Sequence, residues 1–154
     1  MVPGRLLQPR HDAMKATSPC ILTINGGSSS IRFAIYETSK DGQAKLRVVL
    51  AGKIDRIGLA GTNLTADDPT GKAKILVPVV ARSHATAVDF LLDWLSSQPV
   101  FALVKAAGHR VVQGMKHSEP ERITPKLLVE LRRITAYDPD HLPREIALIE
   151  ALER

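Results

Sequence analysis

The sequence contains a single cysteine, few aromatic residues and no long apolar segment. With Cys20 alone, the chain cannot form an internal disulfide, and a metal site built on cysteines is not expected. Aromatic residues make up 4% of the 154 residues, so the core must be mainly aliphatic. No apolar run approaches the roughly 18 residues of a membrane span, and residues 1–17 lack the apolar segment of a secretory signal. These absences favour a cytoplasmic protein without a membrane partner.

The basic residues are scattered along the chain. The formal net charge is +5, but no block of about five or six Lys and Arg residues occurs. A basic balance is compatible with nucleic-acid binding, yet an anionic small-molecule substrate explains it at least as well, and we expect no nucleic-acid partner. With 44% hydrophobic residues, the chain is long enough for one domain with its own core.

The stretch Ile21–Glu37 predicts two strands joined by a tight turn. The turn would contain residues 25–27, Asn-Gly-Gly, because both glycines can adopt positive φ without a Cβ penalty. In the second strand Ile31, Phe33 and Ile35 share one parity and are expected to face the core.

The opposite parity of this second strand carries polar side chains. Ser28, Ser30 and Arg32 would line one wet face if strand pairing already holds at Ser28, and Asn25 would end the preceding strand beside them. Backbone N–H groups, hydroxyls and a permanent cation are the donors that bind phosphate. The alternative is an ordinary serine- and glycine-rich turn without a ligand.

Residues 1–19 are polar, basic and unpatterned, and we expect a disordered extension there, with Met14 as an alternative start. A turn at residues 39–43 precedes a predicted strand at 45–54, and residues 55–74 are expected to form a surface excursion. Residues 75–80 predict a short strand at the sheet edge, since Pro78 cannot donate to a neighbouring strand.

The second half of the chain predicts helices around one further strand. A helix is expected over residues 85–96, capped by Ser83, and a strand over residues 100–107. Thr124 and Pro125 would begin a second helix and Pro143 a third, with a loop at residues 137–141 between them. Three strands followed by helix, strand and helix predict one α/β domain of the ribonuclease H-like class over residues 20–154.

The segment Gly108–Val112, GHRVV, falls where the later strand is expected to end. Ligands of α/β sheets bind at strand ends, and Arg110 would present a planar cation suited to a carboxylate or phosphate there. Taken alone, Arg110 is better explained by a surface ion pair, as most arginines are. A structural role is likewise the default interpretation for His109 and His141.

Two motifs together resemble the acetate kinase family, within the superfamily that also holds sugar kinases and actin. Residues 25–33 resemble its opening motif N-x-G-S-S-S-x-K/R-F, and residues 108–114 resemble its G-H-R-V-V-H-G-G segment. A histidine-containing loop at residues 138–143 follows in the expected order. The resemblance covers roughly residues 20–154.

The resemblance implies a role for each matching residue. Asn25 matches the asparagine that helps hold Mg²⁺, and Ser28, Ser30 and Arg32 match positions that contact the nucleotide or the transferring phosphoryl group. On the substrate side, the positions that match are the carboxylate-binding and charge-stabilising Arg110, the methyl-pocket residue Val112 and the active-site histidine His141. The implied reaction is reversible transfer of a phosphoryl group from ATP to acetate, and the family's full-length proteins are expected to be homodimers.

The sequence also departs from the family pattern. Gln113 replaces a histidine, Met115 replaces a glycine, and Asp140 stands where many members have leucine beside the methyl pocket. An anionic Asp140 would be a poor wall for an acyl chain, which leaves the preferred acid open between acetate, propionate and another short carboxylate. Family members are more than twice as long, so two hypotheses stay open: an N-terminal piece of a kinase that is inactive alone, or a non-catalytic phosphate- or partner-binding remnant.

Overall fold

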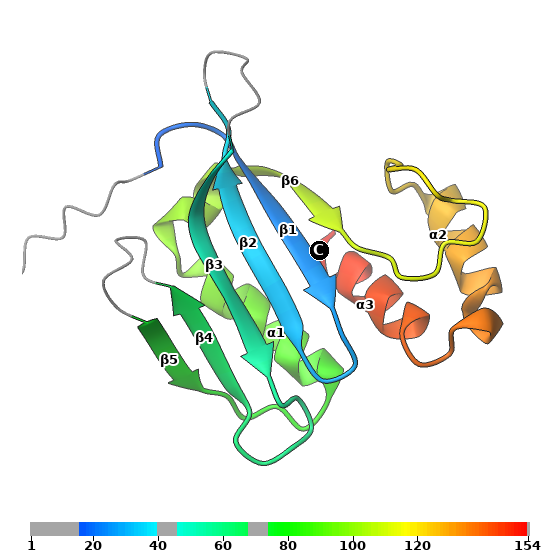
Figure 1. Ribbon diagram of the computed structural model, residues 1–154, viewed down its shortest axis with the longest axis horizontal. Coiled ribbons are helices and arrows are strands. Elements are labelled where there is room, and N and C mark those ends of the chain that lie inside the picture. Colours follow the sequence, from blue (N-terminus) through cyan, green and yellow to red (C-terminus); the bar gives the residue numbers. More distant parts are fainter. Residues whose placement is uncertain (1–15, 40–45, 68–73, 154) are drawn as a thin grey trace, which may run out of the picture.

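A six-stranded sheet is the frame of the protein (Figure 1). The computed structural model describes residues 16–39, 46–67 and 74–153. The strands, in sheet order, are β5 (Lys74–Pro78), β4 (Asn63–Asp67), β3 (Arg47–Asp55), β2 (Ile31–Glu37), β1 (Cys20–Gly26) and β6 (Val104–His109). Neighbours pair antiparallel except β1 and β6, which are parallel. Because β1 and β6 run parallel, their C-terminal ends lie side by side at the same end of the sheet.

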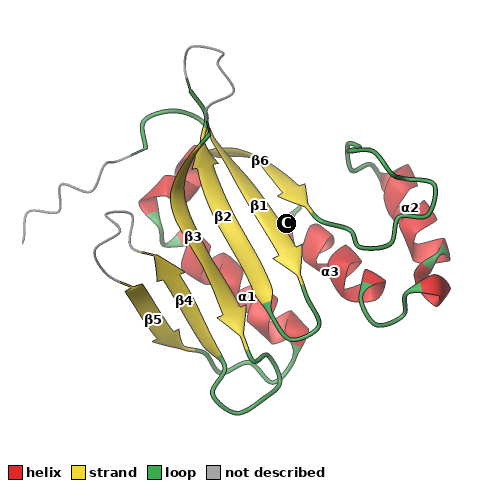
Figure 2. Cartoon of the chain, viewed as in Figure 1, coloured by secondary structure: helices red, strands yellow, loops and turns green. Residues whose placement is uncertain are grey.

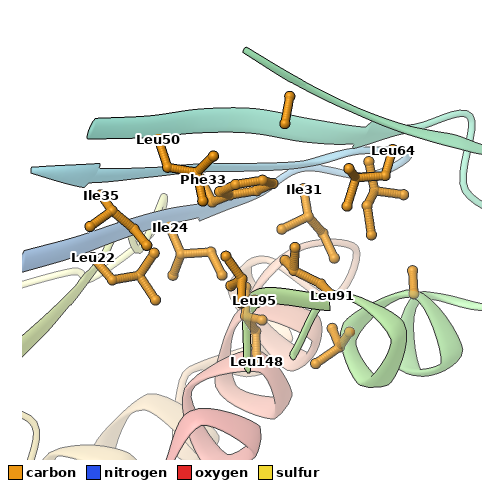
Figure 3. Packing of buried hydrophobic residues seen from close by; sticks show 14 of the residues in the cluster. Leu22, Ile24, Ile31, Phe33, Ile35, Leu50, Leu64, Leu91, Leu95 and Leu148 are labelled. Atoms are coloured by element: carbon orange, nitrogen blue, oxygen red, sulfur yellow. The ribbon is translucent and has the colours of Figure 1, made fainter. Parts of the chain in front are cut away.

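The described helices are α1 (His84–Ser96), α2 (Pro125–Arg133) and α3 (Leu142–Leu152), with short 3₁₀ turns η1 (Pro99–Leu103) and η2 (Thr135–Tyr137). Of these helices, α1 and α3 pack behind one face of this sheet, and α2 packs against α3 away from the sheet (Figure 2). The alternation in β1 and β2 turns apolar side chains toward α1 and α3, as Figure 3 shows. The fully buried side chains there are almost all aliphatic, including Leu22, Ile31, Ile35, Leu91 and Leu95. The predicted aliphatic core is confirmed.

Several local predictions are confirmed at the level of single hydrogen bonds. Ser83 caps α1, because its hydroxyl accepts a hydrogen bond from the Thr86 N–H at 3.2 Å. Thr124 caps α2 in the same way, accepting from the Leu127 N–H at 3.1 Å. The strand containing Pro78 lies at the edge of the sheet, as its missing donor requires.

Three predictions are wrong. Residues 55–74 were expected to form a surface excursion, but they contain strand β4, whose Leu64 and Ala66 are buried. The strand expected over 100–107 begins at Val104, because Pro99 starts a 3₁₀ turn that ends at Leu103. The turn expected at residues 25–27 comprises residues 27–30 instead, because Asn25 and Gly26 are paired in β1, and no glycine of this turn has a positive φ.

Residues 1–15, with the alternative start Met14, and residues 40–43 of the predicted turn lie outside the described residues. Thr17 and Ser18, which the sequence assigned to the extension, lie against β2, and their N–H groups donate to the carboxylate of Glu37. These two donors and Arg47 lower the pKa of Glu37 to about 2. None of the described helices is long and apolar enough to cross a membrane.

Gly52 on β3 lies so close to its neighbours that there is no room for a side chain at this position. A Cβ at this position would lie 2.5 Å from the Thr65 carbonyl oxygen and 2.7 Å from Cζ of Phe33. Gly52→Ala should therefore lower the free energy of unfolding by about 1–3 kcal/mol through overpacking, measured by urea denaturation. Gly108→Ala is the matched control, because its nearest neighbour is 4.0 Å away. Equal stability of Gly52→Ala and wild type would contradict this packing.

Candidate functional site

In the turn between β1 and β2, the backbone carbonyl groups of the three serines all accept hydrogen bonds from other groups of the protein. The Gly27 N–H donates to the Ser30 carbonyl at 2.7 Å, and the Ile57 N–H donates to the Ser29 carbonyl at 2.9 Å. The Ser28 carbonyl accepts a hydrogen bond from Nη1 of Arg144 at 3.1 Å. Within the described part of the chain, the N–H groups of Ser28 and Ser29 make no hydrogen bond. The turn thus leaves donors available for an anion, which is the property of a phosphate cradle.

Asn25 and Arg32 face the same side of the sheet. They are directly opposite each other in the antiparallel register of β1 and β2, and side chains at paired positions share a face. The expectation that strand pairing already holds at Ser28 is wrong, because β2 begins at Ile31 and the three serines form the turn. Strand parity therefore places Arg32, whereas Ser28 and Ser30 are placed by the turn.

Arg110 follows the last residue of β6 and continues the pairing with β1. Its backbone N–H donates to the Ile24 carbonyl at 3.1 Å, next to Asn25. A groove of about 410 Å³ is lined by residues 23–25, 32–34 and 108–110. The structure therefore brings Asn25, Arg32 and Arg110 together on one groove although Arg110 is far away in the sequence.

Val112 and His141 do not line this groove. Val112 is 45% exposed, and its backbone N–H donates to the carboxylate of Glu145, 3.1 Å from Oε2. Nδ1 of His141 lies 2.8 Å from Oδ1 of Asp138. Both residues belong to a neighbouring cluster at the start of α3, where Glu145 is close enough to Arg110 for their charges to interact.

Sequence reasoning missed Glu145, which is 2% exposed. Burial raises its pKa, the nearby Asp138 raises it further, and the Val112 N–H opposes both. The signal was present in the sequence: Glu145 falls on the apolar stripe of α3 with Leu142, Ile146 and Ile149. A carboxylate at such a position needs a partner, and here it accepts a backbone hydrogen bond.

Two half-buried histidines close to the motifs have lowered pKa values. Burial lowers the pKa of His109, which lines the groove, to about 4. Burial also lowers the pKa of His84, the first residue of α1, whose Nε2 is buried without a hydrogen-bond partner in the described structure. His109 therefore adds no positive charge near neutral pH, and Arg32 and Arg110 are the cations among the residues that line the groove.

Met115, which replaces a glycine of the family pattern, has an unfavourable backbone conformation. Its φ of 53° lies in the left-handed region, which favours glycine, and its side chain is 51% exposed. The glycine of the family motif would adopt this conformation without strain.

A protein-family model described as the acetokinase family matches residues 20–154. The chain belongs to the acetokinase family. It is 36% identical over 138 residues to the acetate kinase of Methylocella silvestris, covering 84% of this chain and 34% of that protein. It is 34% identical over 133 residues to the acetate kinase of Deinococcus deserti, covering 86% and 32% respectively. The predicted family is confirmed, and it is a family of phosphotransferases.

Solved acetokinase structures support the same fold. The crystal structure of Porphyromonas gingivalis acetate kinase matches with a TM-score of 0.72 and 26% identity, covering 88% of this chain and 34% of that one. A propionate kinase from Francisella tularensis matches with a TM-score of 0.70 and 25% identity, covering 86% and 33%. These kinases have an actin-like ATPase fold, so the predicted α/β class is confirmed. The chain spans about a third of the length of these relatives.

The half-buried His109 should make stability depend on pH. Its pKa of about 4 in the folded state lies below the ordinary value of 6.5, so the unfolded chain binds the proton more tightly. The contribution of His109 is therefore fully present above pH 6.5 and is lost as the pH falls toward 4. Urea denaturation at pH 7 and pH 4.5 should show a larger loss for wild type than for His109→Gln. Equal losses would contradict a neutral His109 imidazole in the folded state.

Proposed function

We propose that this chain provides the phosphate-binding and carboxylate-binding half of an acetate kinase, which transfers a phosphoryl group between ATP and acetate. The observation that carries the proposal is the single groove lined by Asn25, Arg32 and Arg110. Arg32 of β2 and Arg110, which directly follows β6, line the same groove, as a reaction between two anions requires. Family membership supports the same reaction.

The turn and Arg32 form the nucleotide side of the proposed site. The N–H groups of Ser28 and Ser29 and the hydroxyls of Ser28 and Ser30 would bind phosphate oxygens, with Arg32 adding a charged donor. Asn25 offers one neutral oxygen for Mg²⁺, and the described residues contain no cluster of three acidic, histidine or cysteine side chains. This fits Mg²⁺ bound mainly by phosphate oxygens and water, where it would neutralise phosphate charge.

Arg110 forms the substrate side. Its guanidinium would bind the substrate carboxylate and hold one carboxylate oxygen toward the γ-phosphorus for in-line attack. That oxygen forms the new bond to phosphorus as the bond to the ADP oxygen breaks, and Arg32 and Arg110 stabilise the charge on the transferring group. Val112 and His141 would border the acyl group from the cluster at α3. Because Asp140, a poor wall for an acyl chain, directly precedes His141, propionate or another short carboxylate is the alternative acceptor.

A second candidate follows from the length of the chain. Because it spans about a third of the relatives, a non-catalytic remnant that keeps only phosphate or partner binding is the alternative function. Cations on one side of a transferring group stabilise only part of its charge, and the site must also exclude water. We therefore expect little or no turnover from the 154 residues alone. Cytoplasmic location and homodimer formation stay predictions.

The activity test measures acetyl phosphate trapped with hydroxylamine. The chain alone should give a rate at or near background, whereas the chain fused to the remaining two thirds of the Porphyromonas gingivalis enzyme should be active. In the fusion, Arg110→Ala should lower the rate by about 10²–10³-fold, as removal of a positioned charged donor does. Arg133→Ala, which removes an exposed arginine on α2, is the matched control and should leave the rate unchanged.

Two results would overturn parts of this proposal. Saturable activity of the chain alone, lost on Arg110→Ala, would show that these residues suffice for catalysis. A folded but inactive fusion that still binds inorganic phosphate would favour the non-catalytic remnant.

A further inference from the structure

Two consecutive residues of α3 reach the two motif segments. Nη1 of Arg144 donates to the Ser28 carbonyl of the phosphate turn at 3.1 Å. The Glu145 carboxylate accepts the Val112 N–H of the Arg110 segment, with its oxygens 3.1 and 3.3 Å from that nitrogen. Side chains of adjacent helical residues point about 100° apart, so one turn of α3 contacts segments that are remote from each other in the sequence.

Helix α3 is itself firmly packed along its length. Leu142, Leu148 and Ile149 are at most 2% exposed, and Leu148 belongs to the core cluster behind the sheet. A Cβ on Gly26 would lie 3.3 Å from Cδ2 of Leu148, which shows how closely α3 approaches the end of β1. Arg144 and Glu145 are therefore attached to a helix whose position is fixed relative to β1.

We propose that Arg144 and Glu145 are positioning residues that hold the phosphate turn (residues 27–30) and the Arg110 segment (residues 110–112) in fixed register. The inference rests on the proposed function, because it assigns these two segments to the two substrates. Arg144 keeps the Ser28 carbonyl turned inward, which leaves the N–H groups of Ser28 and Ser29 outward. Glu145 fixes the backbone two residues after Arg110 and so limits where the guanidinium can lie.

Because Glu145 is buried and Arg144 is exposed, we expect Glu145 to contribute more to positioning than Arg144 does. A carboxylate that is 2% exposed loses its hydration, and Leu or Met would pack on the apolar stripe of α3 at lower cost. Arg144 is exposed, so water competes for its hydrogen bond. The titratable groups whose electrostatic interactions reach Glu145 are Asp138, His141 and Arg110. The positive charge of Arg144 lies close to His84 and lowers the pKa of that imidazole. We therefore expect a larger effect from removing Glu145 than from removing Arg144.

Amide hydrogen exchange on the 154-residue chain, followed by NMR at pH 7, tests the proposal. Glu145→Leu should speed exchange of the Val112 amide about 10-fold or more, as expected for a lost hydrogen bond to a charged group. Glu145→Gln keeps an acceptor oxygen and should restore most of the protection. Arg144→Ala should speed exchange of the Gly27 amide about 2- to 5-fold, with partial rescue by Arg144→Lys. The control Arg133→Ala should change neither amide.

Titrations with Mg·ATP and with acetate provide the readout that a merely structural role would not give. Arg144→Ala should weaken binding of Mg·ATP and spare acetate, whereas Glu145→Leu should weaken binding of acetate and spare Mg·ATP. Unchanged exchange at Val112 and Gly27, or faster exchange only together with core amides such as that of Ile35, would overturn the positioning role. Equal weakening of both ligands by each variant would also overturn it. If the wild type binds neither ligand, the proposed function fails, and the exchange rates still decide whether Arg144 and Glu145 position the two segments.

Discussion

The parallel pairing of β6 with β1 is the constraint on which the candidate site depends. It sets His109 beside Ile24, and the Arg110 N–H adds one more hydrogen bond to the Ile24 carbonyl. Asn25 follows Ile24 and is opposite Arg32 in the next strand. The backbone register alone therefore brings the guanidinium groups of two separate motifs to one groove. A shift of β6 by one residue would turn Arg110 to the other face of the sheet.

Local features of the fold could be predicted because neighbouring residues determine them. The alternation of Ile31, Phe33 and Ile35 identified the core face of β2, and hydroxyl caps identified the starts of α1 and α2. Strand β4 was not predicted, because three of its five residues are Asn, Thr and Asp, a composition typical of loops. Its pairing with β3 and β5 overrides that composition, since strand propensity depends on context.

The candidate site, like the fold, was predictable only in its local features. The residue types of the two motifs were visible in the sequence, but their meeting in space required the strand order β2-β1-β6. The hydrogen bond from Arg144 to Ser28 joins residues 116 positions apart. No short-range pattern encodes such a contact. Glu145 is intermediate, because its place on an apolar helix stripe marked it as unusual but did not reveal its partner.

The most direct test of this account is a titration of the ¹⁵N-labelled chain with acetyl phosphate, which carries the acyl and phosphoryl groups in one small molecule. The shared groove predicts that amides of residues 25–30 and of residues 108–112 shift together and fit one dissociation constant. Amides of residues 75–77 in β5, at the opposite edge of the sheet from β6, should stay unchanged. Shifts in only one of the two segments, or two different dissociation constants, would contradict a single site built by the pairing of β1 with β6.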